Sequence, residues 1–121
     1  MDTNGNTKEL LIKDLSSRLP YGVKVNGVFL IYDKDKDKIL YKECVKELNY
    51  EHLNRYETLK PYLFPLSSMT EEQEKEWRYT LSSDYNITYD TVDWLNKNHF
   101  DYRGLIEKSL ALDATNLGIY E

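Results

Sequence analysis

The stretch YGVKVNGVFLIYDKDKDKILYKECV (residues 21–45) carries the strand-forming residues on which the fold depends. Val, Ile, Phe and Tyr recur there at alternate positions, which is the period of a half-buried strand. The pair Asn26-Gly27 accepts positive φ at both turn positions, so it predicts a tight hairpin turn. We therefore expect strands at about 22–26 and 28–33, and a third strand at about 38–45.

The run DKDKDK (residues 33–38) lies between the second and third of these strands. Its alternating charges are typical of a solvated hairpin tip or strand edge, where they oppose pairing with another chain. The alternate aspartates also resemble the start of a calcium loop. An EF-hand loop needs glycine at its sixth position and glutamate at its twelfth, where this chain has Lys38 and Cys44. The solvated tip is therefore the favoured interpretation, and calcium binding is a minor alternative.

Helical periodicity before this stretch predicts part of the second layer that three strands need. Leucine recurs at every fourth position from Leu11 to Leu19, which places these side chains on one helical face. Asn6 is a suitable N-cap, so the expected helix covers about residues 7–19. Residues 1–5 are expected to be disordered.

Capping signals predict three more helices in the second half of the chain. These are residues 71–82 capped by Thr70, a helix that follows its cap Asp90 and runs to about Asn98, and residues 102–111 capped by Asp101. The tail, residues 113–121, is expected to be extended.

Two segments in the middle of the chain are less regular. Residues 46–60 are interpreted as a short helix or an irregular segment. The two prolines of PYLFP (residues 61–65) remove backbone donors, so this piece is expected to be an extended connector rather than a central strand.

Together these elements predict one α+β domain over residues 1–121. A small antiparallel sheet, with an SH3-like partial barrel as one variant, would pack against the N-terminal helix and two or three C-terminal helices. The expected core consists of Leu11, Leu15, Leu19, Val23, Val25, Phe29, Ile31, Leu40, Leu63, Trp77, Leu81, Trp94, Leu95, Leu105, Ile106 and Leu110.

Composition excludes several classes of protein. A chain of 121 residues has room for one domain with a real core. The longest apolar run, Val28–Tyr32, is far shorter than the ~20 residues that span a bilayer, so no membrane association is expected. The first residues, MDTNGNTKELL, lack the pattern of a signal peptide. A single cysteine fits a reducing compartment, and we expect a cytoplasmic protein.

The charge distribution argues against a nucleic-acid footprint. The net charge is −5, with +1 on residues 1–69 and −6 on residues 70–121. The acidic C-terminal half would repel a phosphate backbone. Its simplest interpretation is a solvated, solubilising surface.

No motif identifies a catalytic, cofactor or metal site. Cys44 could act as a nucleophile only with His52 or His99 within hydrogen-bond reach, and a buried strand cysteine is the favoured interpretation. The two histidines are far apart and have no zinc-ligand spacing. Phosphate-binding, dinucleotide-binding and hydrolase motifs are absent from the sequence. We predict no catalytic residue, no metal ligand and no cofactor.

The densest group of recognition-type residues lies in residues 94–104. The sequence is rich in tyrosine, with 11, and Trp, Tyr and Arg are the residues that dominate interface hot spots. The alternative is structural, with Asp101 capping a helix and the aromatic side chains filling the core. The candidate interaction patch consists of Trp94, His99, Phe100, Asp101, Tyr102 and Arg103.

Three stretches carry a resemblance to a known family: RLPYGVKV (18–25), KPYLFPLSSMTEEQ (60–73) and WLNKNHFDYRGLIEKSLALDAT (94–115). They resemble small uncharacterised proteins of gut Bacteroides-type bacteria and of their phages and mobile elements. The resemblance covers about a third of the chain, and residues 26–59 depart from it most. It implies a cytoplasmic accessory protein and assigns no site residue.

Three function classes follow. The favoured one is a non-enzymatic accessory protein that acts by protein–protein interaction with an unidentified partner. The second is a nucleic-acid-associated small β-barrel module, which predicts salt-sensitive binding. The third is an enzyme with a site assembled from Asp, Glu, His or Cys side chains. The sequence fixes neither the partner nor the oligomeric state.

Overall fold

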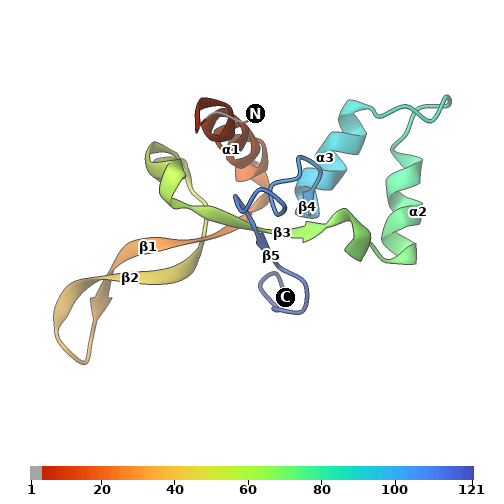
Figure 1. Ribbon diagram of the computed structural model, residues 1–121. Helices are drawn as coiled ribbons and strands as arrows, with labels where there is room; N and C mark the ends of the chain where they lie inside the picture. The colour runs from red at the N-terminus through yellow and green to blue at the C-terminus, as the bar shows by residue number, and fades with distance from the viewer. Residues whose placement is uncertain (1–3) are drawn as a thin grey trace.

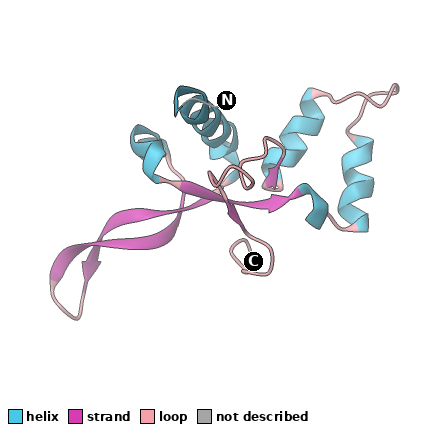
Figure 2. Ribbon diagram, viewed as in Figure 1, coloured by secondary structure: helices cyan, strands magenta, loops and turns pink. Residues whose placement is uncertain are grey.

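The computed structural model describes residues 4–121 and has an α+β architecture, as predicted (Figures 1 and 2). The strands form a small mixed sheet in the order β2-β1-β3-β4, and β5 also pairs with β3. In chain order the elements are α1 (Asn4–Arg18), the 3-10 turn η1 (Leu19–Tyr21), β1 (Lys24–Asp33), β2 (Lys38–Glu47), the 3-10 segment η2 (Tyr50–Thr58), β3 (Lys60–Pro65), the 3-10 turn η3 (Leu66–Ser68), α2 (Glu71–Tyr79), α3 (Tyr89–Lys97), β4 (Phe100–Asp101) and β5 (Leu112–Asp113).

The hairpin turn lies at residues 34–37 and not at Asn26-Gly27. β1 continues straight through Asn26 and Gly27, and Gly27 does not have a positive φ. A Cβ atom at Gly27 would lie 2.6 Å from Cδ2 of Leu59. The glycine is therefore required by the close approach of η2's end to the strand, and the predicted turn at this pair is wrong.

The DKDKDK run forms the tip of the hairpin, in agreement with the favoured interpretation. The Asp33 carboxylate accepts hydrogen bonds from the backbone N–H groups of Asp35, at 3.0 Å, and Lys36, at 3.3 Å. Asp37 takes a positive φ of 49°. These aspartates thus build the turn itself.

β3 is a central strand, so the prediction of a connector at PYLFP is wrong. It pairs antiparallel with β1 and parallel with both β4 and β5. Its prolines lie near the two ends of the strand, and Tyr62, Leu63 and Phe64 between them carry the ladder bonds. For example, the N–H of Phe64 donates to the carbonyl of His99 at 2.8 Å. Two parallel pairings make the sheet mixed instead of wholly antiparallel, and its strand order is open instead of a barrel.

The capping predictions had mixed outcomes. The Thr70–Gln73 capping box is present at the start of α2, which ends at Tyr79, three residues earlier than expected. α3 is capped by Thr88 with Thr91, so the Asp90 cap is wrong. The Thr88 hydroxyl is the acceptor in place of the predicted Asp90 carboxylate, so the helix begins less than one turn earlier than expected.

α1 also begins earlier than predicted. It starts at Asn4, so Asn6 lies inside the helix and is not its cap. Residues 4 and 5 are helical, whereas residues 1–3 of the segment expected to be disordered lie outside the described residues. Pro20 and Gly22, with a φ of 70° at the glycine, end the helix as expected.

The predicted helix over residues 102–111 is absent. Gly104 and Ser109 both have positive φ, near 74° and 61°, and these values interrupt an α-helix. The segment forms a series of turns. Asp101 still acts like a helix cap, because its carboxylate accepts hydrogen bonds from the backbone N–H groups of Leu105 and Ile106.

The C-terminal tail is docked on the sheet and is not simply extended. Residues 112–113 form β5, and the chain then curls back beneath the sheet (Figure 1). The Tyr120 hydroxyl donates to the carbonyl of Tyr62 at 2.6 Å and accepts the N–H of Lys24 at 2.9 Å. These bonds join the end of the chain to β1 and β3.

The core lies where α1, η2 and the turns after β4 cover the base of β1 and β3. Of the predicted core residues, Leu11, Leu15, Val23, Val25, Phe29, Leu63, Leu95 and Leu105 are buried. The other predicted core residues, Leu19, Ile31, Leu40, Trp77, Leu81, Trp94, Ile106 and Leu110, are only partly buried. Cys44 is likewise partly buried at the edge of this core. The prediction missed Leu48, Leu59, Phe100, Ala111 and Ala114.

Candidate interaction surfaces

The structure brings the predicted patch together around a buried ion pair. Nε of Arg18 lies 2.8 Å from Oδ2 of Asp14, and both side chains are fully buried. Nη2 of Arg18 donates to the carbonyl of Phe100 at 2.6 Å. A charged pair of this kind thus joins α1 to β4, which lies 82 positions further along the chain.

Arg103 and Tyr102 extend this network towards the surface. Nη1 of Arg103 donates to Asp14 Oδ1 at 3.1 Å and to the Tyr102 hydroxyl at 2.8 Å. That hydroxyl in turn donates to Oδ1 of the buried Asn96 at 2.8 Å. The Arg103 guanidinium also stacks 4.6 Å from the centre of the Tyr102 ring. Both side chains are half-buried, and their polar groups are used within the chain.

The remaining patch residues also make internal contacts. The Trp94 and Phe100 rings stack with centroids 5.6 Å apart, and Phe100 and Asp101 are buried. His99 has a positive φ of 63° and stacks on Tyr120 at 3.8 Å. A partner could reach only the half-buried members, so the patch as a binding surface stays a prediction.

Burial sets the electrostatics of this network. Burial raises the pKa of Asp14, although Arg18 and Arg103 oppose that effect. Burial, helped by the charges of Arg18 and Lys24, lowers the pKa of His99 to about 4. His99 is therefore neutral near pH 7, and its buried Nδ1 has no hydrogen-bond partner among the described residues. The histidine belongs to the packing of the tail.

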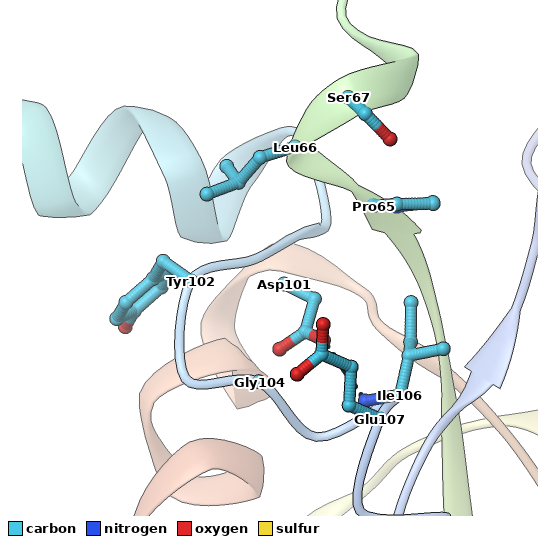
Figure 3. A pocket seen from close by; sticks show the side chains of 8 residues that line it. All are labelled: Pro65, Leu66, Ser67, Asp101, Tyr102, Gly104, Ile106 and Glu107. Carbon is cyan, nitrogen blue, oxygen red and sulfur yellow. Dashed lines mark hydrogen bonds between the residues drawn. The ribbon is translucent and has the colours of Figure 1, made fainter.

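A cavity of about 370 Å³ lies beside the patch, between the end of β3 and the turn after β4 (Figure 3). Its walls combine Pro65, Leu66 and Ile106 with the carboxylates of Asp101 and Glu107. The volume suits a small ligand. However, the Asp101 carboxylate already accepts two backbone N–H groups, so its main role is structural.

The distal part of the β1–β2 hairpin, residues 28–45, projects away from the rest of the chain as an arm (Figure 1). One face of this arm carries large apolar side chains in water, and Tyr41 and Ile39 are 73% and 67% exposed. Residues directly opposite in the antiparallel register share a face. Leu30 lies opposite Tyr41, and Tyr32 lies opposite Ile39. We call this surface the outer apolar face; it consists of Val28, Leu30, Tyr32, Ile39, Tyr41 and Val45.

Sequence reasoning found these strands but missed this face. The signal was the continuous run Val28–Tyr32, which is apolar on both faces of the strand. In a hairpin, only one face can meet a core that lies on one side. Phe29 takes the core side and is buried, so its neighbours Val28 and Leu30 are left exposed.

A second exposed apolar group lies around the loop between α2 and α3. Tyr79, Tyr85, Ile87 and Tyr89 are all exposed there, and Tyr89 is 92% exposed. They are placed on two helix ends and an irregular loop, and do not share the face of one regular element. This group serves below as the rival surface.

His52, one of the two possible bases for Cys44, takes part in a helix cap. Nδ1 of His52 accepts a hydrogen bond from the backbone N–H of Asn49 in the cap of η2.

Across residues 4–121, no three His, Cys, Asp or Glu side chains gather in a way that could hold a metal ion. No helix in the same range is long and apolar enough to cross a membrane.

No protein-family model, no curated protein and no solved structure matches this sequence. The resemblance to small proteins of Bacteroides-type bacteria and their phages therefore stays a prediction.

Proposed function

We propose that the protein is a non-enzymatic interaction module and that the outer apolar face of its arm binds a protein partner. The observation that carries this proposal is the alignment of six exposed apolar side chains on one face of a regular hairpin. Contiguous exposed apolar patches of this kind mark interaction sites. An accessory protein of a phage or mobile element, as the resemblance implies, would act through such a contact.

The arm is well suited to binding because its backbone is already ordered. Each strand is held by a continuous ladder from Lys24↔Glu47 to Asp33↔Lys38, so little backbone entropy remains to be lost when a partner docks. Tyrosine adds large amphipathic area with few rotatable bonds. Burial of apolar area contributes roughly 25 cal/mol per Å². The outer apolar face therefore offers a favourable free energy that the isolated chain does not use.

The experiment is photocrosslinking with a photoreactive phenylalanine analogue at position 41 in the host cell. The matched position is 89, because Tyr41 and Tyr89 are both strongly exposed tyrosines and lie on different surfaces. We expect protease-sensitive adducts of defined mass from the analogue at position 41 and few from the analogue at position 89.

The other outcomes contradict the proposal. Adducts from position 89 alone would assign the contact to the rival surface. Nuclease-sensitive adducts from position 41 would favour the nucleic-acid module instead. The absence of any adduct from position 41, in a variant that unfolds at the same urea concentration as the natural chain, would remove the arm as a binding element.

A further inference from the structure

We propose that the free edge of β2 binds an extended peptide segment that carries acidic residues at every fourth position and apolar residues on its other face. This inference rests on the proposed function, since it names the class of partner that the arm takes. It begins from the place of β2 at the end of the strand order, where β1 is its only pairing strand within residues 4–121.

β2 presents unpaired backbone groups along ten residues, Lys38–Glu47. Alternate N–H and C=O groups of an edge strand point outward and can pair with an added strand. The other edge of the arm is less open. At its base β1 pairs with β3 through Val25 and Asn26, and the Val28 carbonyl accepts a hydrogen bond from Arg55. β2 is therefore the longer available edge.

The two faces of β2 differ in chemistry. Ile39, Tyr41 and Val45 belong to the outer apolar face. The opposite face carries Lys38, Lys42 and Lys46, which we call the lysine row. All three lysines are exposed, and none forms an ion pair with a residue of the described chain.

Cross-strand neighbours on β1 neutralise only part of this row. Lys38 lies opposite Asp33, whereas Lys42 lies opposite Phe29 and Lys46 opposite Val25. The ammonium group of Lys46 lies 5.3 Å from the centre of the Phe29 ring. This face of β2 thus carries a positive row with a spacing of four residues, or about 13 Å in an extended strand.

Charge complementarity selects the added strand. Opposite charges directly across a ladder stabilise pairing, and like charges oppose it. A strand antiparallel to β2 would need carboxylates opposite the lysine row, a cation opposite Glu43 and apolar residues opposite Ile39, Tyr41 and Val45. Read from its N-terminus, which lies beside Lys46, the sequence EVTKEVTVE meets these requirements.

The same rule argues against a second copy of the chain. If two copies of β2 pair antiparallel about a two-fold axis, the lysine rows of both copies lie on the same side of the combined sheet. On this face, β2 contributes Lys38, Leu40, Lys42, Cys44 and Lys46, and none of these residues has a carboxylate. Self-pairing would therefore bring two positive rows together without a counter-charge, which blocks association of the edges.

The test titrates the full chain, labelled with ¹⁵N, with the peptide EVTKEVTVE and with its charge-inverted counterpart KVTEKVTVK. Four charge pairs change sign between the peptides, three with the lysine row and one with Glu43, so we expect the acidic peptide to bind about ten-fold or more tightly. Its binding should protect alternate backbone amides of β2 from exchange. Lys42→Glu should weaken the acidic peptide about three-fold or more and strengthen the inverted one. Lys75→Glu, an exposed lysine on α2, is the control with the same charge change.

Four results would overturn the inference. They are equal binding of both peptides, no binding of either up to about 1 mM, protection confined to β1, and tighter binding of an oligonucleotide than of the acidic peptide. Concentration-dependent dimers in which the backbone amides of β2 are protected from exchange would assign the edge to a second copy and also overturn it. If Tyr41 still crosslinks a protein in any of these cases, only the edge-strand inference fails, and the proposed function stands.

Discussion

Arg18 and Asp14 form a fully buried ion pair one helical turn apart, and the pair connects α1 to the carbonyl of a residue in β4. Buried charges are costly to remove from water, and they are tolerated where their partners are well placed. Here Asp14 contacts two arginines, at 2.8 and 3.1 Å. The network therefore fixes the position of the helix relative to the C-terminal half of the chain.

Asp14→Ala should destabilise the protein by about 3–5 kcal/mol, because it leaves the Arg18 guanidinium buried without a counter-charge. Urea unfolding measures the loss. The pair Glu74–Arg78 on α2 is the matched control, since it has the same spacing and the same 2.8 Å distance but is largely exposed. Glu74→Ala should cost less than about 1 kcal/mol. Equal losses in the two variants would show that burial of the Asp14 pair has no special role.

Gly27→Ala should also be destabilising, by about 1–3 kcal/mol, because the new methyl group would overlap the Leu59 side chain. Shortening Leu59 to alanine removes the clash but leaves a cavity in the core. A double-mutant cycle separates the two effects. We expect the pair of substitutions to cost less than the sum of the single changes. Strict additivity would mean that the close approach at Gly27 does not explain why the glycine is there.

The titration of His99 should lower the stability of the protein as the pH falls from about 6.5 towards 4, whereas the raised pKa of Asp14 acts in the opposite direction. The pKa of His99 is lowered to about 4 in the folded chain, and the ordinary value of 6.5 applies after unfolding. Between these values the unfolded chain binds a proton that the folded chain does not, so acid favours unfolding. Burial lowers the pKa of His52 as well, which adds an effect of the same sign.

His99→Asn tests this prediction, because asparagine tolerates the positive φ at this position and does not titrate. Urea midpoints compared at about pH 7 and about pH 5.5 avoid most carboxylate titration. The variant should show a smaller change than the natural chain, and His52→Asn measures the other histidine separately. A His99→Asn variant with the full pH dependence would contradict the assignment.

The local parts of the fold could be predicted from the sequence, and the errors arose where distant residues decide the outcome. The capping box at Thr70 depends on Gln73 alone, and it is present. The Asn26-Gly27 pair has the local pattern of a turn. However, the side chain of Leu59, which lies 32 positions away in the sequence, packs so close to Gly27 that no Cβ atom fits there. Likewise, the absence of the last helix follows from positive φ values at Gly104 and Ser109. Only the glycine could have signalled it.

The candidate patch illustrates the same limit. Composition indicates a dense group of aromatic and charged residues at 94–104. Whether such a group faces solvent or the core depends on its partners. Asp14 and Arg18, which engage Arg103 and Phe100, lie more than 80 positions earlier in the chain. The arm shows the reverse case, because its apolar run is a core pattern until the structure places one face outside the core.

The most direct test of the central claim is the crosslink yield at position 41 in a chain that also carries Leu30→Ser. Leu30 lies opposite Tyr41 on the outer apolar face and is 56% exposed, so the substitution should change the free energy of unfolding by no more than about 0.5 kcal/mol. The account predicts that the protein adduct is largely lost while stability is kept. An unchanged adduct yield would contradict it, because the partner would then not depend on the apolar face of the arm.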